Sequence, residues 1–199
     1  MNRTTRRIGL VALIAVAGAL AYGLGLALRP PPELAGTALQ QPPRVVDLDL
    51  VRGDGSAVSL ADIATGGTTL VFFGFTRCPD VCALTMANLA RIYEHLGEPD
   101  DLTVAMITVD PEHDTPELLD RYVRAFHGDF VALTGTNAQI ATAARTFFIG
   151  YAGIGTETFV HTDVVAVIDR AGALRYVYGQ DALRRLASDL GHIRRLPGF

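Results

Sequence analysis

The amino-acid sequence predicts an α/β domain in which helices cover a mixed central sheet. Residues 69–75 and 102–109 form two near-continuous apolar runs, which are typical of strands buried on both faces. A helical pattern follows each run, and this alternation favours parallel strands joined by crossover helices. Residues 164–169 and 174–178 predict a closing antiparallel hairpin around an Arg-Ala-Gly turn at residues 170–172.

The remaining elements follow from local patterns. Residues 45–50 alternate apolar and acidic side chains, and an Arg-Gly-Asp-Gly turn separates them from residues 57–60, which predicts an N-terminal hairpin. Thr115 followed by Pro116 is a typical helix start. We expect a short strand at residues 130–133 and helices at residues 83–96, 115–126, 137–147 and 181–195.

The N-terminal segment predicts a membrane anchor. Residues 8–28 are 21 uncharged, mostly aliphatic residues, a length that can cross a bilayer as a helix. Three arginines precede the run and one follows it, which favours an exported C-terminal part. We therefore expect residues 1–29 to form one transmembrane helix in a bacterial inner (cytoplasmic) membrane, with the domain on the periplasmic side. A cleaved signal peptide is the alternative, although its apolar core is usually shorter.

The rest of the chain predicts one acidic domain on a tether. Residues 30–43 hold five of the ten prolines and predict an extended tether, which leaves residues 44–199 for the folded domain. That length is enough for one domain with a sizeable core. Residues 30–199 carry 13 arginines against 21 carboxylates, a net charge of −8 that argues against nucleic acid as a partner.

Cys78 and Cys82 are the only cysteines, and they directly follow the first apolar strand in the run Gly-Phe-Thr-Arg-Cys-Pro-Asp-Val-Cys. They therefore lie at a strand-to-helix junction, on neighbouring turns of one helix face if the helix begins there. Closing so short a loop would give a structural disulfide only about 2 kcal/mol in the chain-entropy model. The position predicts the thioredoxin-like version of the fold, in which the turn into the first long helix carries reactive thiols.

Two chemistries remain open for this pair. A helix N-terminus favours the thiolate, the form that attacks disulfides and binds metals, whereas Asp80 between the cysteines opposes that shift. Three residues separate the thiols, one more than the commonest spacing for disulfide exchange, and the wider loop leaves room for an ion. The sequence therefore favours a redox-sensitive metal site and keeps a thiol–disulfide couple as the alternative.

A third ligand would complete such a metal site. His161 lies at the mouth of the predicted strand 164–169, and in a thioredoxin-like sheet the loop that enters this strand faces the cysteine turn. Two thiolates and one imidazole suit copper as Cu(I) or Cu(II), whereas zinc usually demands a fourth ligand. Met86 could offer a thioether, but its place in an apolar helix predicts a core residue. Lone histidines are usually solvated or capping, and His95, His127 and His192 lie in helix-end contexts; His113 is the fifth histidine of the chain.

Four motifs in the same order resemble those of the SCO/SenC family of copper-binding cytochrome c oxidase assembly proteins. They are FFGFTRCPDVC at residues 72–82, VDPEHDTP at 109–116, FVALTGT at 130–136, and His161 with Thr162. The likeness covers about residues 43–196, and the order of the motifs makes it specific. The resemblance implies a thioredoxin-like domain that binds copper through Cys78, Cys82 and His161.

The resemblance also implies a function. It indicates a membrane-anchored metallochaperone that assists assembly of the binuclear copper site of cytochrome c oxidase subunit II, with an upstream copper donor and a thioredoxin-like reductant as further candidate partners. The alternative is an extracytoplasmic thiol–disulfide oxidoreductase that reduces the cysteines of that site, so enzymatic activity stays open. A peroxidase is disfavoured, because nothing marks Thr76 and Arg77 as specialised partners of a peroxidatic cysteine.

Three positions depart from the family pattern. Ala83 stands where proline is usual, and His113 stands where arginine is common. Val160 replaces the acidic residue that usually precedes the histidine, and such a carboxylate can orient an imidazole. Asp163 is a candidate for compensation. Asp110 and Asp114 either present an acidic surface or turn the chain into the next helix, and we favour the second interpretation.

Overall fold

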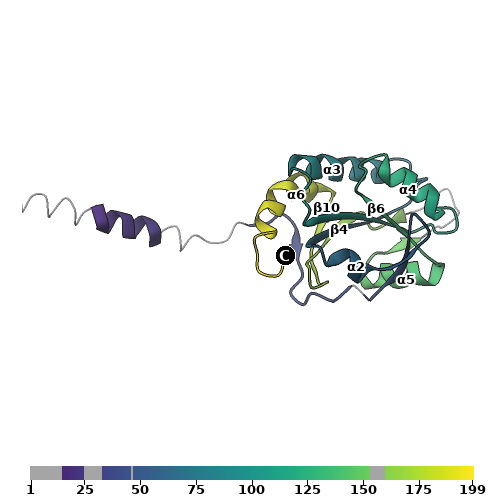
Figure 1. Cartoon of the computed structure of the whole chain (residues 1–199), viewed down its shortest axis with the longest axis horizontal. Coiled ribbons are helices and arrows are strands. Elements are labelled where there is room, and N and C mark those ends of the chain that lie inside the picture. The colour runs from purple at the N-terminus through teal and green to yellow at the C-terminus, as the bar shows by residue number, and fades with distance from the viewer. Residues whose placement is uncertain (1–14, 25–32, 46, 153–159) are drawn as a thin grey trace, which may run out of the picture. The chain divides into compact units, whose positions relative to one another are not determined.

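The computed structural model describes residues 15–24, 33–45, 47–152 and 160–199 (Figure 1). The chain divides into two compact units, residues 1–33 and residues 34–199. Residues 15–24 form a helix in the first unit. All other helices and strands described below belong to the second unit.

The prediction of a transmembrane helix is wrong. None of the helices in the described residues is both long enough and apolar enough to cross a bilayer. Residues 8–14 and 25–28 of the apolar run lie outside the described residues. The predicted single-pass location in a bacterial inner membrane, with a periplasmic domain, depended on that helix and is contradicted by the same finding.

The second unit is built on an eight-stranded mixed sheet. The central strand β4 pairs with β5 in parallel and with β9 in antiparallel orientation, and β5 and β6 are also parallel. The N-terminal hairpin of β2 and β3 joins the sheet beside β6. In spatial order the strands are β1 (Thr37–Ala38), β10 (Leu174–Gly179), β9 (Val164–Ile168), β4 (Thr68–Gly74), β5 (Leu102–Thr108), β6 (Val131–Thr134), β2 (Asp49–Arg52) and β3 (Ala57–Ser59).

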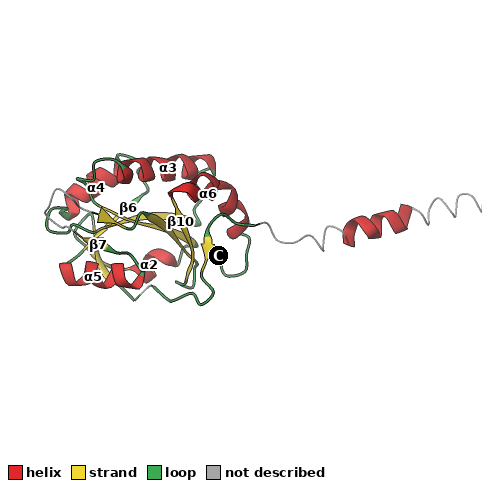
Figure 2. Ribbon diagram, turned by 180° about the vertical axis from the view of Figure 1, so that it is seen from behind, coloured by secondary structure: helices red, strands yellow, loops and turns green. Residues whose placement is uncertain are grey.

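Helices cover both faces of this sheet, as Figures 1 and 2 show from opposite sides. On one face lie α3 (Val81–His95), α4 (Pro116–Arg124) and α6 (Gln180–Ile193). On the other lie α2 (Leu60–Ala64) and α5 (Asn137–Thr146). The predicted mixed α/β sheet with a thioredoxin-like arrangement is therefore confirmed.

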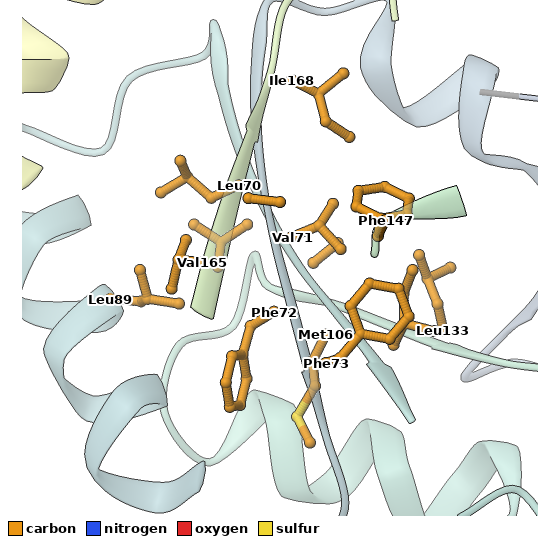
Figure 3. Packing of buried hydrophobic residues seen from close by; sticks show 14 of the residues in the cluster. Leu70, Val71, Phe72, Phe73, Leu89, Met106, Leu133, Phe147, Val165 and Ile168 are labelled. Atoms are coloured by element: carbon orange, nitrogen blue, oxygen red, sulfur yellow. The ribbon is translucent and has the colours of Figure 1, made fainter. Parts of the chain in front are cut away.

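The core follows from the alternation of side chains along β4, all of whose residues are buried. Figure 3 shows Phe72 on the side of Leu89 from α3, and Phe73 on the side of Phe147, which follows α5. The rings of Phe73 and Phe147 lie 5.2 Å apart between centroids. A strand that is apolar on both faces can be stable only between two layers of helices, which is why β4 lies at the centre.

Local differences from the prediction are small but bear on the site. Helix α3 begins at Val81, so Cys82 belongs to its first turn. Thr136 caps α5, because its hydroxyl accepts a hydrogen bond from the backbone N–H of Gln139 in a capping box. Strand β1 falls within the segment expected as a tether and pairs with β10, and the short helix α2 was not predicted.

Candidate copper site

The two cysteines meet where β4 ends and α3 begins. The backbone N–H of Cys78 donates to the carbonyl of Phe75 at 3.3 Å, which closes the turn after the strand. The backbone N–H of Cys82 donates to the Cys78 sulfur, also at 3.3 Å. Both cysteines are free thiols, Cys78 half-buried and Cys82 fully buried. The structure thus brings two soft sulfur donors together at the predicted strand-to-helix junction, with Cys78 just before α3 and Cys82 in its first turn.

Gly74 forms the wall behind the inner sulfur. A Cβ atom at this position would lie 2.7 Å from a ring carbon of Phe72, 2.9 Å from the Met106 methyl and 3.3 Å from the Cys82 sulfur. The last residue of β4 is therefore glycine because Phe72, Met106 and Cys82 all pack directly against the backbone at this position.

Burial is the main cause that raises the pKa of the Cys82 thiol. A hydrogen bond with Cys78 and the negative charge of Asp163 raise it further. The sequence suggested that the start of a helix would favour a thiolate, but for Cys82 the loss of solvation outweighs the helix dipole. In the metal-free protein Cys82 is therefore a thiol at neutral pH.

A buried carboxylate holds the turn that carries the cysteines. Asp114 has no exposed surface, and it accepts hydrogen bonds from the Thr76 backbone N–H at 3.1 Å, from the Thr76 hydroxyl, and from the Thr108 hydroxyl at 2.6 Å. Thr108 is the last residue of β5, so this network ties the turn to the neighbouring strand. The favoured interpretation of Asp114 as a structural residue agrees with this burial.

Asp110 also supports the turn that carries the cysteines. It is buried and accepts a hydrogen bond at 2.6 Å from the guanidinium of Arg77, whose side chain is about half exposed. The ion pair fixes the residue that directly precedes Cys78. Sequence reasoning missed this support of the turn by Thr76, Arg77 and Thr108. The sequence did hold a signal for this support. Two polar residues directly precede the first cysteine, and two aspartates follow the second buried strand, which ends next to the first one.

The structure describes only the backbone of His161. It belongs to β8 (Val160–His161), which pairs with β7 (Tyr151–Ala152) so that His161 lies opposite Tyr151. The next residue, Thr162, fixes this ribbon, since its N–H donates to the Gly150 carbonyl at 2.8 Å. The side chains of Val160 and His161 lie outside the described part of the structure, so the role of His161 as a ligand stays a prediction.

The segment after His161 approaches the cysteines. Strand β9 runs antiparallel to β4 with Val165 opposite Phe72, so the residues just before β9 lie beside the end of β4. Asp163 is near enough for its charge to act on the Cys82 sulfur. Asp163 was predicted only as a substitute for the acidic residue missing at Val160, and that role stays a prediction.

Two of the other candidate ligand residues, Met86 and His127, pack against neighbouring side chains. Met86 is fully buried in the core, as predicted. His127 packs between Tyr93 and Phe130, with ring centroids 4.9 and 5.2 Å away. His95 and His192 lie in the last turns of α3 and α6.

A model of the SCO1/SenC family matches residues 37–193 of this chain. The chain belongs to the SCO1/SenC family. The sequence motifs and the fold lead to the same family, so the predicted resemblance is confirmed. BsSco, a solved structure that shares this fold at 22% identity, is a member of the Sco family of cytochrome c oxidase assembly proteins.

Individual relatives show how far the similarity extends. The mitochondrial SCO2 homolog of Homo sapiens is 35% identical over 159 residues, which are 72% of this chain and 58% of that protein. The apo Sco1 protein of Thermus thermophilus is 36% identical with a TM-score of 0.69, over 81% of this chain and 97% of that one. Arabidopsis thaliana ScoI, solved with copper bound, is 28% identical with a TM-score of 0.69, over 78% of this chain and 98% of that one. The chain spans about half the length of several curated relatives it matches.

Proposed function

We propose that this SCO1/SenC protein is a copper metallochaperone that holds copper as its cargo through Cys78, Cys82 and His161. Its proposed recipient is the binuclear copper site of cytochrome c oxidase subunit II. The observation that carries the proposal is the pair of free thiols at the junction of β4 and α3, with Cys82 buried in the first turn of α3 and Cys78 half-buried just before the helix. Copper bound to Arabidopsis ScoI supports the same cargo here.

The donor set fits a soft ion. Thiolates favour Cu(I), and an added imidazole helps to hold Cu(II). Because Cys82 is buried, its thiolate is costly without a nearby cation, and a bound copper ion offsets that cost. Because Cys78 is half-buried, one sulfur stays accessible to the ligands of a recipient protein. A site that binds copper and also releases it to a partner needs both properties.

The topology supports His161 as the third ligand. The pairing of Val165 with Phe72 brings the start of β9 to the end of β4 that leads into the cysteine turn. Asp163, two residues after His161, acts electrostatically on Cys82. A histidine in this segment therefore has a short path to the sulfurs.

Anaerobic Cu(I) titration of the full chain tests this function. We expect one copper ion per chain in the wild type, loss of binding in Cys78→Ala and Cys82→Ala, and clearly weaker binding in His161→Ala. His192→Ala is the matched control, because it removes an exposed histidine from the last turn of α6. Unchanged affinity in His161→Ala would refute the three-ligand site.

A thiol–disulfide oxidoreductase is the second candidate, and the unequal exposure of the thiols favours it. The half-buried Cys78 can attack a substrate disulfide, and the buried Cys82 can then resolve the mixed disulfide. In this reaction Cys78 and Cys82 lose two electrons and form a disulfide, while the substrate disulfide becomes two thiols. The reaction needs both cysteines but not His161. If the copper-free His161→Ala variant reduces an oxidised subunit II domain, the protein acts as an oxidoreductase and not only as a copper carrier.

A further inference from the structure

A groove between α3 and α6 gathers basic side chains on a domain whose net charge is negative. The two helices pack side by side on one face of the sheet (Figures 1 and 2), and the groove between them has a volume of about 350 Å³. Every ionisable side chain that lines it is basic: Arg91, His95 and Arg184. The acidic residues of the two helices do not line it; they are Glu94, Asp181 and Asp189.

The two arginines of the groove are open to a partner. Both are exposed, and Arg91 donates to two neutral groups of its own helix, the Ala87 carbonyl at 3.4 Å and the side-chain oxygen of Asn88. Among the residues that the structure describes, neither Arg91 nor Arg184 forms a salt bridge. A guanidinium carries five N–H donors in a planar fork that matches a carboxylate. The groove is therefore suited to carboxylate groups.

The groove begins at the end of the molecule that carries the cysteines. Strand β9 is antiparallel to both β4 and β10, so these two strands end at the same edge of the sheet, and the helices that follow them begin there. At this end the side-chain amide of Gln180, a lining residue, donates to the Thr85 hydroxyl at 2.7 Å. Thr85 lies three residues after Cys82, so the groove runs along α3 away from the cysteine turn.

An exposed apolar side chain lies between the cysteines and the groove. Leu84 is 55% exposed and comes two residues after Cys82. Its spacing from Asn88, Arg91 and His95 is four, seven and eleven residues, which puts all four on one face of α3. An apolar contact beside the metal site, continued by polar and cationic side chains, is the usual composition of a protein interface and its rim.

We propose that the α3–α6 groove, with Leu84 at its cysteine end, is the docking surface for an acidic segment of the protein that takes copper from Cys78. This inference rests on the proposed carrier function. Charge complementarity selects the occupant, because carboxylates of the partner pair with Arg91 and Arg184 while its copper ligands reach the half-buried Cys78. Exposed charges across an interface act mainly on the rate of association and on the choice of partner. Such contacts suit a partner that docks, takes its cargo and leaves.

Binding of the metal-free full chain to the copper-binding domain of cytochrome c oxidase subunit II tests the inference. We expect the double variant Arg91→Glu, Arg184→Glu to bind this domain at least about 10-fold more weakly in isothermal titration calorimetry at low salt, since attraction becomes repulsion. The wild-type affinity should fall as salt is added, and that of the variant should depend much less on salt. The Cu(I) affinity should stay at the wild-type value, because neither arginine contacts the thiols.

Two further variants sharpen the test. The milder double variant Arg91→Gln, Arg184→Gln removes the charges without reversing them and should show a smaller loss with the same reduced salt dependence. Leu84→Ala should weaken binding at every salt concentration, because it removes an apolar contact.

Arg145→Glu is the matched control for the single variant Arg91→Glu. Arg145 is also exposed and also donates to a neutral group of its own helix, the Thr142 hydroxyl at 3.0 Å. It belongs to α5, on the opposite face of the sheet (Figure 2). The same change of charge there should leave binding close to that of the wild type.

The outcomes separate the docking surface from the function on which it rests. Wild-type affinity in the double charge reversal, an equal loss in Arg145→Glu, or no binding of the wild type would overturn the docking surface. A parallel loss of Cu(I) affinity would also overturn it, because the arginines would then act on the metal site. If the wild type binds the domain through the groove but transfers no Cu(I) to it, the carrier function is overturned and the docking surface stands.

Discussion

The backbone N–H of Cys82 donates a hydrogen bond to the sulfur of Cys78, at 3.3 Å. This contact gives the two sulfurs different environments. The Cys78 sulfur is half-buried and accepts a polarised donor, whereas Cys82 has no exposed surface and lies against Gly74. Unequal exposure suits a site that must bind an ion securely and also present one ligand to a partner.

The first prediction concerns thiol reactivity. In the reduced, metal-free protein at neutral pH, iodoacetamide should modify Cys78 at least about 10-fold faster than Cys82, because Cys82 is buried and its pKa is raised. Peptide mass spectrometry after timed quenching gives the two rates. In guanidinium chloride the rates should become similar. Equal rates in the folded protein would show that Cys82 is more accessible than the structure indicates.

The second prediction concerns Asp114. Asp114→Ala should lower the free energy of unfolding by about 2–4 kcal/mol, because Thr76 and Thr108 lose a buried acceptor. It should also narrow the difference in alkylation rate between the cysteines, since the turn loses its tie to β5. Denaturant unfolding and the same alkylation assay measure both effects. Asp100→Ala, at an exposed position, is the control and should change stability by no more than about 0.5 kcal/mol.

The sequence was sufficient to predict the central elements, because each carries a strong local signal. Residues 69–75 were predicted as a strand buried on both faces, and the structure has β4 at Thr68–Gly74. The cysteines were placed at the turn into the first long helix, where they lie. These predictions depended on apolar runs and on spacing, both of which act over a few residues.

Contacts between distant residues were harder to predict. Thr76 and Asp114 are 38 positions apart, and no local sequence pattern predicts the hydrogen bonds between them. Strand β1 has only two residues, and its pairing with β10 depends on the far end of the chain. Apolar length predicted a membrane-spanning helix at residues 8–28, and this prediction is wrong, since the described residues contain no helix that could cross a membrane.

The third prediction concerns pH and Tyr178. This side chain is fully buried, and burial, together with its hydrogen bond to Asp189 at 3.0 Å, raises its pKa. Because the folded-state pKa is higher than the unfolded value of about 10, its contribution to stability is complete below about pH 10 and is lost as the pH rises further. Above that pH the free energy of unfolding should fall by up to about 1.4 kcal/mol per pH unit from this group alone.

Tyr178→Phe isolates that contribution. The variant should be about 1 kcal/mol less stable at neutral pH, because it loses the hydrogen bond to Asp189. Its stability should then fall less steeply than that of the wild type above pH 10. Identical alkaline slopes in urea unfolding would show that Tyr178 ionises equally easily in the folded and unfolded states.

The fourth prediction uses the close contact between Gly74 and Cys82. In Gly74→Ala the new methyl group would meet Phe72, Met106 and the Cys82 sulfur, all closer than ordinary van der Waals contact. Overpacking of this kind costs about 1–3 kcal/mol, and here the displaced group is a proposed copper ligand. We therefore expect Gly74→Ala to lower both the melting temperature and the Cu(I) affinity. Gly66→Ala is the control, since nothing lies within 4 Å of a Cβ at that position. A Gly74→Ala variant that lost stability but kept full copper affinity would contradict this prediction. Copper binding would then not depend on the position of the Cys82 sulfur against β4.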